Sequence, residues 1–108
     1  MIKKYNKLIR DRILEIIKAS GERPSWRTLN KKEYLKEIKK KILEEAKELS
    51  AAKNKKEVVN EIVDIQELLD VLILKLGLKK SELKKKQKIK NKERGGFKNR
   101  PFLIKTEK

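Results

Sequence analysis

Cysteine and histidine are absent from this 108-residue chain, and their absence narrows the chemistry that it can perform. Without cysteine there is neither a disulfide framework nor a thiol nucleophile, and without histidine the commonest acid/base group and the commonest zinc ligand are missing. Catalysis would therefore depend on carboxylates, hydroxyls, lysine, arginine or a metal ion held by oxygen atoms. The length suits one domain with a modest core, so residues 1–108 are expected to form a single domain.

Long apolar runs are also missing. The longest, Val71 to Leu74, is far below the roughly 20 residues that span a bilayer, and the amino terminus has no apolar signal segment. We therefore expect a cytoplasmic protein with no membrane partner.

Acidic residues are scarce overall but concentrated in one region. The chain has 32 lysine and arginine residues against 16 aspartate and glutamate residues, and its net charge of +16 first suggests polyanions as partners. Eight of the acids nevertheless lie within residues 44–70. Two interpretations compete: a basic helical protein that binds nucleic acid and has a structural acidic cluster, or a protein with a site for a divalent cation.

Hydrophobic periodicity predicts an all-α fold. Apolar residues recur at intervals of three and four, the spacing of one helical face, and residues that cap or end helices separate the segments. Four helices are expected, over about residues 7–20, over about residues 31–52, between Asn54 and Gly77, and from Ser81 onward. The second and third each begin with an asparagine followed three residues later by a glutamate, which is the spacing of a capping box.

The second and third helices are separated by a very short turn, which predicts an antiparallel hairpin over about residues 31–77. One hairpin cannot bury its own apolar face, so the other two helices or a second subunit must cover it. We therefore expect a four-helix-type bundle that is oligomeric. The basic C-terminal region, about residues 84–108, ends in an irregular apolar tail that could include a short strand.

Acidic side chains are expected to meet inside this hairpin. Glu45 and Glu48 share one face of the second helix, and Glu61 and Asp64 share one face of the third, because residues three apart on a helix are neighbours. The two pairs lie at nearly the same distance from the turn, on the inward side, where acids are costly unless something neutralises them. Mg²⁺ prefers such oxygen ligands. The alternative is that the acids lie on solvated faces beside lysines.

These acids also resemble a known signature. The segment "EEAKE", twelve further residues and then "EIVD" are similar to the EExxE and ExxD motifs of the all-α nucleoside triphosphate pyrophosphohydrolases, which include MazG-like proteins and phosphoribosyl-ATP pyrophosphohydrolase. The segments "YNKLIRDRILEII" and "KNKERGGF" resemble the two ends of a small MazG-like subgroup. The chain departs from the pattern at Leu14, where proline is usual, and at Val63, where alanine is usual.

The resemblance implies a homodimer or higher homo-oligomer that hydrolyses a nucleoside triphosphate, or phosphoribosyl-ATP, to the monophosphate and pyrophosphate. It also implies Mg²⁺, or Mn²⁺ in its place, as the cofactor. The metal ligands would be Glu45, Glu48, Glu61 and Asp64. Glu45 or Glu48 would orient or deprotonate the attacking water, and Glu44 would support the site or act on that water itself.

Basic residues near both ends of the chain are candidates to bind the substrate phosphates. They are Lys7, Arg10, Arg12, Lys90 and Arg94. Gly95 and Gly96 could let the backbone approach a phosphate or could simply end a helix. Trp26 and Phe97 could stack on a base, or could anchor the core or a subunit interface. A catalytically silent scaffold is the third alternative to an enzyme and a nucleic-acid-binding protein.

Overall fold

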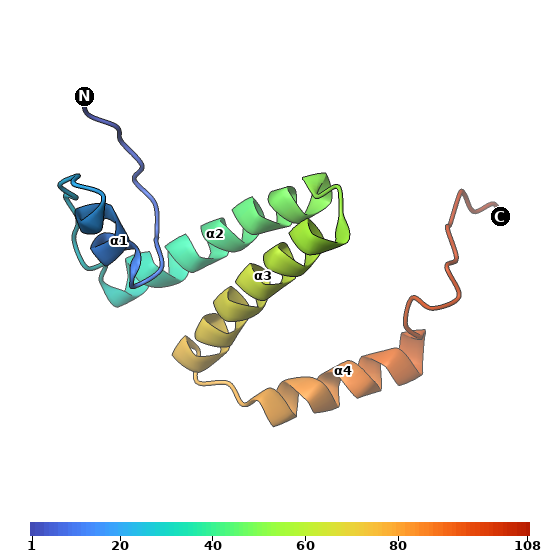
Figure 1. Ribbon diagram of the computed structural model, residues 1–108. Coiled ribbons are helices and arrows are strands. Elements are labelled where there is room, and N and C mark those ends of the chain that lie inside the picture. Colours follow the sequence, from blue (N-terminus) through green and yellow to red (C-terminus); the bar gives the residue numbers. More distant parts are fainter. The chain divides into compact units, whose positions relative to one another are not determined.

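The protein is all-α, as the hydrophobic periodicity predicted. A computed structural model describes residues 1–108 and has four helices and no strand (Figure 1). The helices are α1 (Ile13–Ala19), α2 (Lys31–Ala51), α3 (Lys55–Lys75) and α4 (Lys80–Arg94). The chain divides into two compact units, Met1–Leu76 and Gly77–Lys108. The single domain, the four-helix-type bundle and the oligomer remain predictions.

Helix α1 is shorter than expected. The apolar spacing predicted a helix over about residues 7–20, but α1 has 7 residues and begins after Arg12, whose side chain makes no capping hydrogen bond. Asn6 has a φ of 47°, which few residues other than glycine adopt, and it redirects the backbone before the helix. Lys7 and Arg10 form ion pairs with residues of α2 and α3. Residues 7–12 thus lie outside the helix, and two of their side chains contact distant acids that a local pattern does not reveal.

Helices α2 and α3 begin where the asparagine caps predicted. The Asn30 side chain accepts a hydrogen bond from the Glu33 backbone N–H at 2.9 Å, and Glu33 accepts one in return from the Asn30 backbone N–H at 3.4 Å. At α3 the Asn54 side chain accepts from the Glu57 N–H at 2.9 Å, but Glu57 accepts from the N–H of Lys53 instead of Asn54. The reciprocal capping box is thus complete only at α2.

The turn over residues 52–54 sends α3 back along α2, and the two helices contact each other (Figure 1). Ile38 of α2 is fully buried, while apolar residues such as Ile42 of α2 and Ile65 and Leu68 of α3 are half-buried. This thin apolar layer fixes which side chains of the two helices face each other. It therefore determines the geometry of the acidic region.

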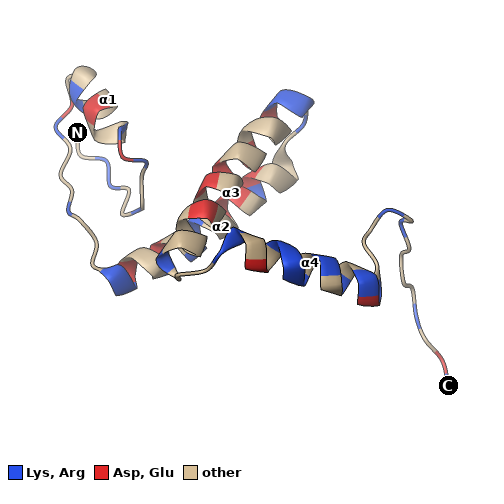
Figure 2. Ribbon diagram, turned by 90° about the horizontal axis from the view of Figure 1, so that it is seen from below, with Lys and Arg blue, Asp and Glu red and all other residues tan.

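The second unit consists of α4 and the C-terminal tail. Lysine and arginine dominate α4, as the blue ribbon of Figure 2 shows, and all but one of its residues are exposed. The short strand considered for the apolar tail does not form: residues 101–108 have no regular structure. A strand needs a partner strand to complete its hydrogen bonds, and the remaining regular elements are helices. None of the four helices combines the length and the apolarity that crossing a membrane requires.

Candidate functional site

Three carboxylates from two helices converge where α2 and α3 meet. Glu45 lies two turns after Ile38 on the same face of α2, so packing that buries the isoleucine also buries the glutamate, which is 7% exposed. Glu61 and Asp64, one turn apart on α3, face it and are half-buried. One oxygen from each of the three carboxylates lies within 4.8 Å of the others. We call Glu45, Glu61 and Asp64 the acidic cluster.

Two oxygens of the acidic cluster are buried without a hydrogen-bond partner. They are Oε2 of Glu45 and Oε2 of Glu61. Buried polar atoms in folded proteins are nearly always paired, because an unpaired one has lost its water without compensation. Burial, the neighbouring Glu61 and Glu48 carboxyl groups, and their negative charges raise the pKa of Glu45 to about 8. These two oxygens therefore call for a positive charge, from a proton or from a cation.

A divalent cation would supply that charge. The donor set consists of carboxylate oxygens alone, which suits a hard cation such as Mg²⁺ or Mn²⁺ and does not suit zinc, whose sites usually include nitrogen or sulfur. The two unpaired oxygens belong to two carboxylates of this set, one from α2 and one from α3. The residues present thus fit a metal ion.

The remaining two predicted acids lie beside the cluster rather than within it. Glu48 is close enough to Glu45 to raise the pKa of Glu45, but it is exposed. Glu44 is turned about a quarter of the way round the helix from Glu45, as adjacent helical residues are, and its carboxylate pairs with Lys7 at 3.8 Å. The structure therefore separates Glu44 from Glu45, which the motif alone had left open.

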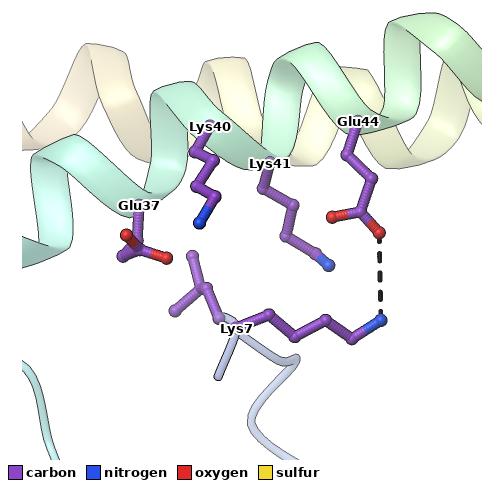
Figure 3. Close-up of a pocket in the computed structure, with 6 residues that line it drawn as sticks. Lys7, Glu37, Lys40, Lys41 and Glu44 are labelled. Atoms are coloured by element: carbon purple, nitrogen blue, oxygen red, sulfur yellow. Dashed lines mark ion pairs between the residues drawn. The ribbon is translucent and has the colours of Figure 1, made fainter. Parts of the chain in front are cut away.

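Two of the predicted phosphate-binding residues lie against these acids. The Arg10 guanidinium donates to Asp64 Oδ1 at 2.6 Å, and the pair is partly exposed. Figure 3 shows Lys7 extended toward Glu44, with Lys40 and Lys41 of α2 around the same small cavity. The cavity holds about 20 Å³, room for about one water molecule and far too little for a nucleotide. Lys7 and Arg10 thus pair with acids in this structure, and their binding of phosphate stays a prediction.

The other predicted residues lie elsewhere. Arg12 is exposed, precedes α1 and pairs with Glu15 of that helix at 3.5 Å. Lys90 and Arg94 belong to the second unit, one turn apart on α4, and are exposed. Their binding of phosphate stays a prediction. Trp26 is 60% exposed and Phe97 is 94% exposed, so the expectation that either anchors the core of this chain is wrong.

Comparison with known proteins places most of the chain in one family. The model of the phosphoribosyl-ATP pyrophosphohydrolase family matches residues 2–91, well over half of the chain. An uncharacterized protein of Mycolicibacterium smegmatis is 51% identical over 45 residues, which are 42% of this chain and 46% of that protein. The match thus spans about half the length of that relative. No solved structure matches the chain.

Proposed function

The chain belongs to the phosphoribosyl-ATP pyrophosphohydrolase family, and on that premise we propose that it is a Mg²⁺-dependent nucleotide pyrophosphohydrolase. Membership supports nucleotide pyrophosphohydrolase activity in general, whereas the metal and the substrate are parts of the proposal. The substrate would be a nucleoside triphosphate or phosphoribosyl-ATP, which water cleaves to the monophosphate and pyrophosphate. We include removal of modified or damaged nucleotides as the cellular role.

One observation carries the proposal: Glu45 is buried among acids, and an oxygen of Glu45 and one of Glu61 have no hydrogen-bond partner. An acidic group that served only solubility would lie in water beside lysines. A buried set of unpaired carboxylate oxygens destabilises the protein unless a cation or protons neutralise it. Such a costly arrangement is expected at a functional site.

The acidic cluster would hold the metal ion, with Glu48 beside it. Bound there, Mg²⁺ would neutralise charge on the phosphate oxygens and lower the pKa of a water molecule. Side chains of the protein would position the attacking water and accept its proton.

We assign Glu48 to the attacking water. It is exposed, so that water reaches it, and it is adjacent to Glu45, which is buried within the cluster. A carboxylate oxygen of Glu48 would accept a proton from the water as the water oxygen bonds to the α-phosphorus. The bond from that phosphorus to the bridging oxygen breaks, and pyrophosphate leaves. Glu44, paired with Lys7, would support the site without handling the proton.

The test is pyrophosphate release from a panel of ordinary and modified nucleoside triphosphates and phosphoribosyl-ATP, with Mg²⁺ and with a chelator. We expect turnover only with the metal, and loss of it in Glu61→Gln, which keeps the shape of the side chain but removes its charge. Glu67→Gln is the matched control, because Glu67 is an exposed acid of the same helix outside the cluster. Full activity of Glu61→Gln would show that the acidic cluster is not the site.

A second candidate function rests on α4. Its 15 residues include eight lysine or arginine residues and two glutamates, which favours contact with a polyanion such as nucleic acid. Nucleic-acid binding through this helix would survive Glu61→Gln and would weaken steeply as salt is raised, because phosphate contacts release counterions. The same variant therefore separates the two candidates.

A further inference from the structure

Arg10 pairs with an oxygen of one of the three carboxylates that the proposed function assigns to the metal. Its guanidinium lies 2.6 Å from Asp64 Oδ1, across 54 residues of sequence. No other cation is described at an oxygen of the acidic cluster, since Lys7 pairs with Glu44 outside it. Arg10 is thus the positive charge that the protein itself supplies to this site.

The surroundings of Arg10 allow its side chain to leave Asp64 without unfolding a regular element. The residue precedes α1, and its side chain is 53% exposed. Its backbone carbonyl accepts a hydrogen bond from the Ile13 N–H at 3.1 Å, which ties the backbone to the start of α1. Motion of the side chain about this fixed backbone therefore suffices to free the carboxylate.

We propose that Arg10 is an internal counter-cation that competes with the divalent metal for Asp64 and is released from that carboxylate when the metal binds. The competition follows from charge: a guanidinium and a divalent cation on one carboxylate repel each other, and the ion carries the larger charge. This inference rests on the proposed function, since it takes the acidic cluster as the metal site. The freed guanidinium then lies beside the metal, where it pairs with a phosphate oxygen of the substrate.

The first experiment measures Mg²⁺ affinity by titration calorimetry without nucleotide, so that catalysis plays no part. We expect Arg10→Gln to bind Mg²⁺ about fivefold more tightly than the wild type, which corresponds to removing a partly exposed ion pair. Arg27→Gln is the matched control: Arg27 makes an equally short contact with Glu33, 2.6 Å, at the start of α2 and outside the cluster. This control should bind Mg²⁺ as the wild type does. In Arg10→Lys the competing charge remains, and the affinity should stay near that of the wild type.

The second experiment compares thermal unfolding in chelator and in saturating Mg²⁺. Arg10→Gln should unfold at a lower temperature than the wild type in chelator, and this difference should vanish in Mg²⁺ because the metal-bound wild type no longer has the contact. Arg27→Gln should lower the unfolding temperature equally in both conditions. That equal loss is the pattern of a purely structural ion pair.

The outcomes separate this inference from the proposed function. Unchanged or weaker Mg²⁺ binding by Arg10→Gln, or a loss of stability that persists in Mg²⁺, would mean that Arg10 stays on Asp64 and would overturn the inference while the proposed function stands. If neither the wild type nor Arg10→Gln binds a divalent cation, both fail. Tighter binding together with a vanishing stability difference supports the competition.

Discussion

At the scale of single residues, Glu45 has the most unusual environment in the protein. It lies on the apolar face of α2, two turns after Ile38. Burial is the largest cause that raises the pKa of Glu45 from an ordinary 4.5 to about 8. A buried carboxyl group among other acids can be neutralised by a proton or by a metal ion, and the two exclude each other. The metal-free protein should therefore hold a proton at neutral pH that the metal-bound protein does not hold.

This proton predicts a pH dependence of stability. Between about pH 4.5 and pH 8 the folded state binds a proton that the unfolded state has lost, so the free energy of unfolding in chelator should fall as pH rises through this window. Urea unfolding at pH 5.5 and pH 8 measures it. The chain has no histidine, so few other groups titrate between these values. Glu45→Gln, which stays neutral, should remove most of the pH dependence, and saturating Mg²⁺ should restore stability to the wild type at pH 8.

Glu67→Gln is the control for this measurement, because it removes an exposed charge from α3 and leaves the acidic cluster intact. It should retain the pH dependence of the wild type. An equally steep fall in stability in Glu45→Gln would show that another group holds the proton.

At the scale of elements, the start of α2 is the best-secured helix terminus. Asn30 and Glu33 cap each other's backbone, and Arg27 donates two hydrogen bonds to Glu33, at 3.1 and 2.6 Å. The Arg27 side chain, followed by the Asn30 backbone N–H, lowers the pKa of Glu33, so this carboxylate stays charged beside the helix N-terminus. Because α2 carries Glu45, this end of the helix also anchors one side of the acidic cluster.

Loss of the cap should therefore destabilise the protein measurably. We expect Asn30→Ala to lower the free energy of unfolding by about 0.5–2 kcal/mol, the usual cost of removing an asparagine cap. Circular dichroism during urea unfolding would measure it. Asn60→Ala is the matched control, since Asn60 is exposed within α3 and alanine is the better helix former there. A larger loss in Asn60→Ala than in Asn30→Ala would contradict the role of the cap.

The elements also show which local patterns were reliable. Caps and helical periodicity act over three or four residues, so the starts of α2 and α3 could be predicted from Asn30 and Asn54. The start of α1 and the absence of a strand in the tail could not be predicted from local sequence patterns. Residues before α1 make side-chain contacts with acids far away in the sequence, and a strand depends on a neighbouring strand that the structure does not contain.

At the scale of the whole molecule, α3 has more apolar surface than the chain covers. One face lies toward α2, while a second stripe is exposed: Val59 at 49%, Ile62 at 52%, Val63 at 56% and Leu69 at 39%. A helix that is apolar on more than one side must be covered on more than one side. A second copy of the chain would present the same apolar stripe as a partner surface.

We therefore expect the protein to self-associate through this stripe of α3, as a dimer or a higher oligomer. The double variant Val59→Lys with Val63→Lys should shift sedimentation at micromolar concentration toward the monomer, because lysines in an apolar interface lose their hydration. Ile16→Lys is the control: Ile16 is 62% exposed but lies on α1. A wild type that sediments as a monomer at every concentration would contradict this expectation.

The sequence by itself determined the all-α class and the starts of α2 and α3, because helical periodicity and caps act over a few residues. It also predicted that Glu45, Glu48, Glu61 and Asp64 would converge across a short turn, and the structure brings Glu45, Glu61 and Asp64 together. Only the tertiary structure decided that Glu45 is buried with an unpaired oxygen, that Glu48 stays exposed, and that Arg10 lies on Asp64. The pairing of Arg10 with Asp64 joins residues 54 positions apart. No local pattern encodes it, since such a contact depends on how the loop before α1 closes over two packed helices.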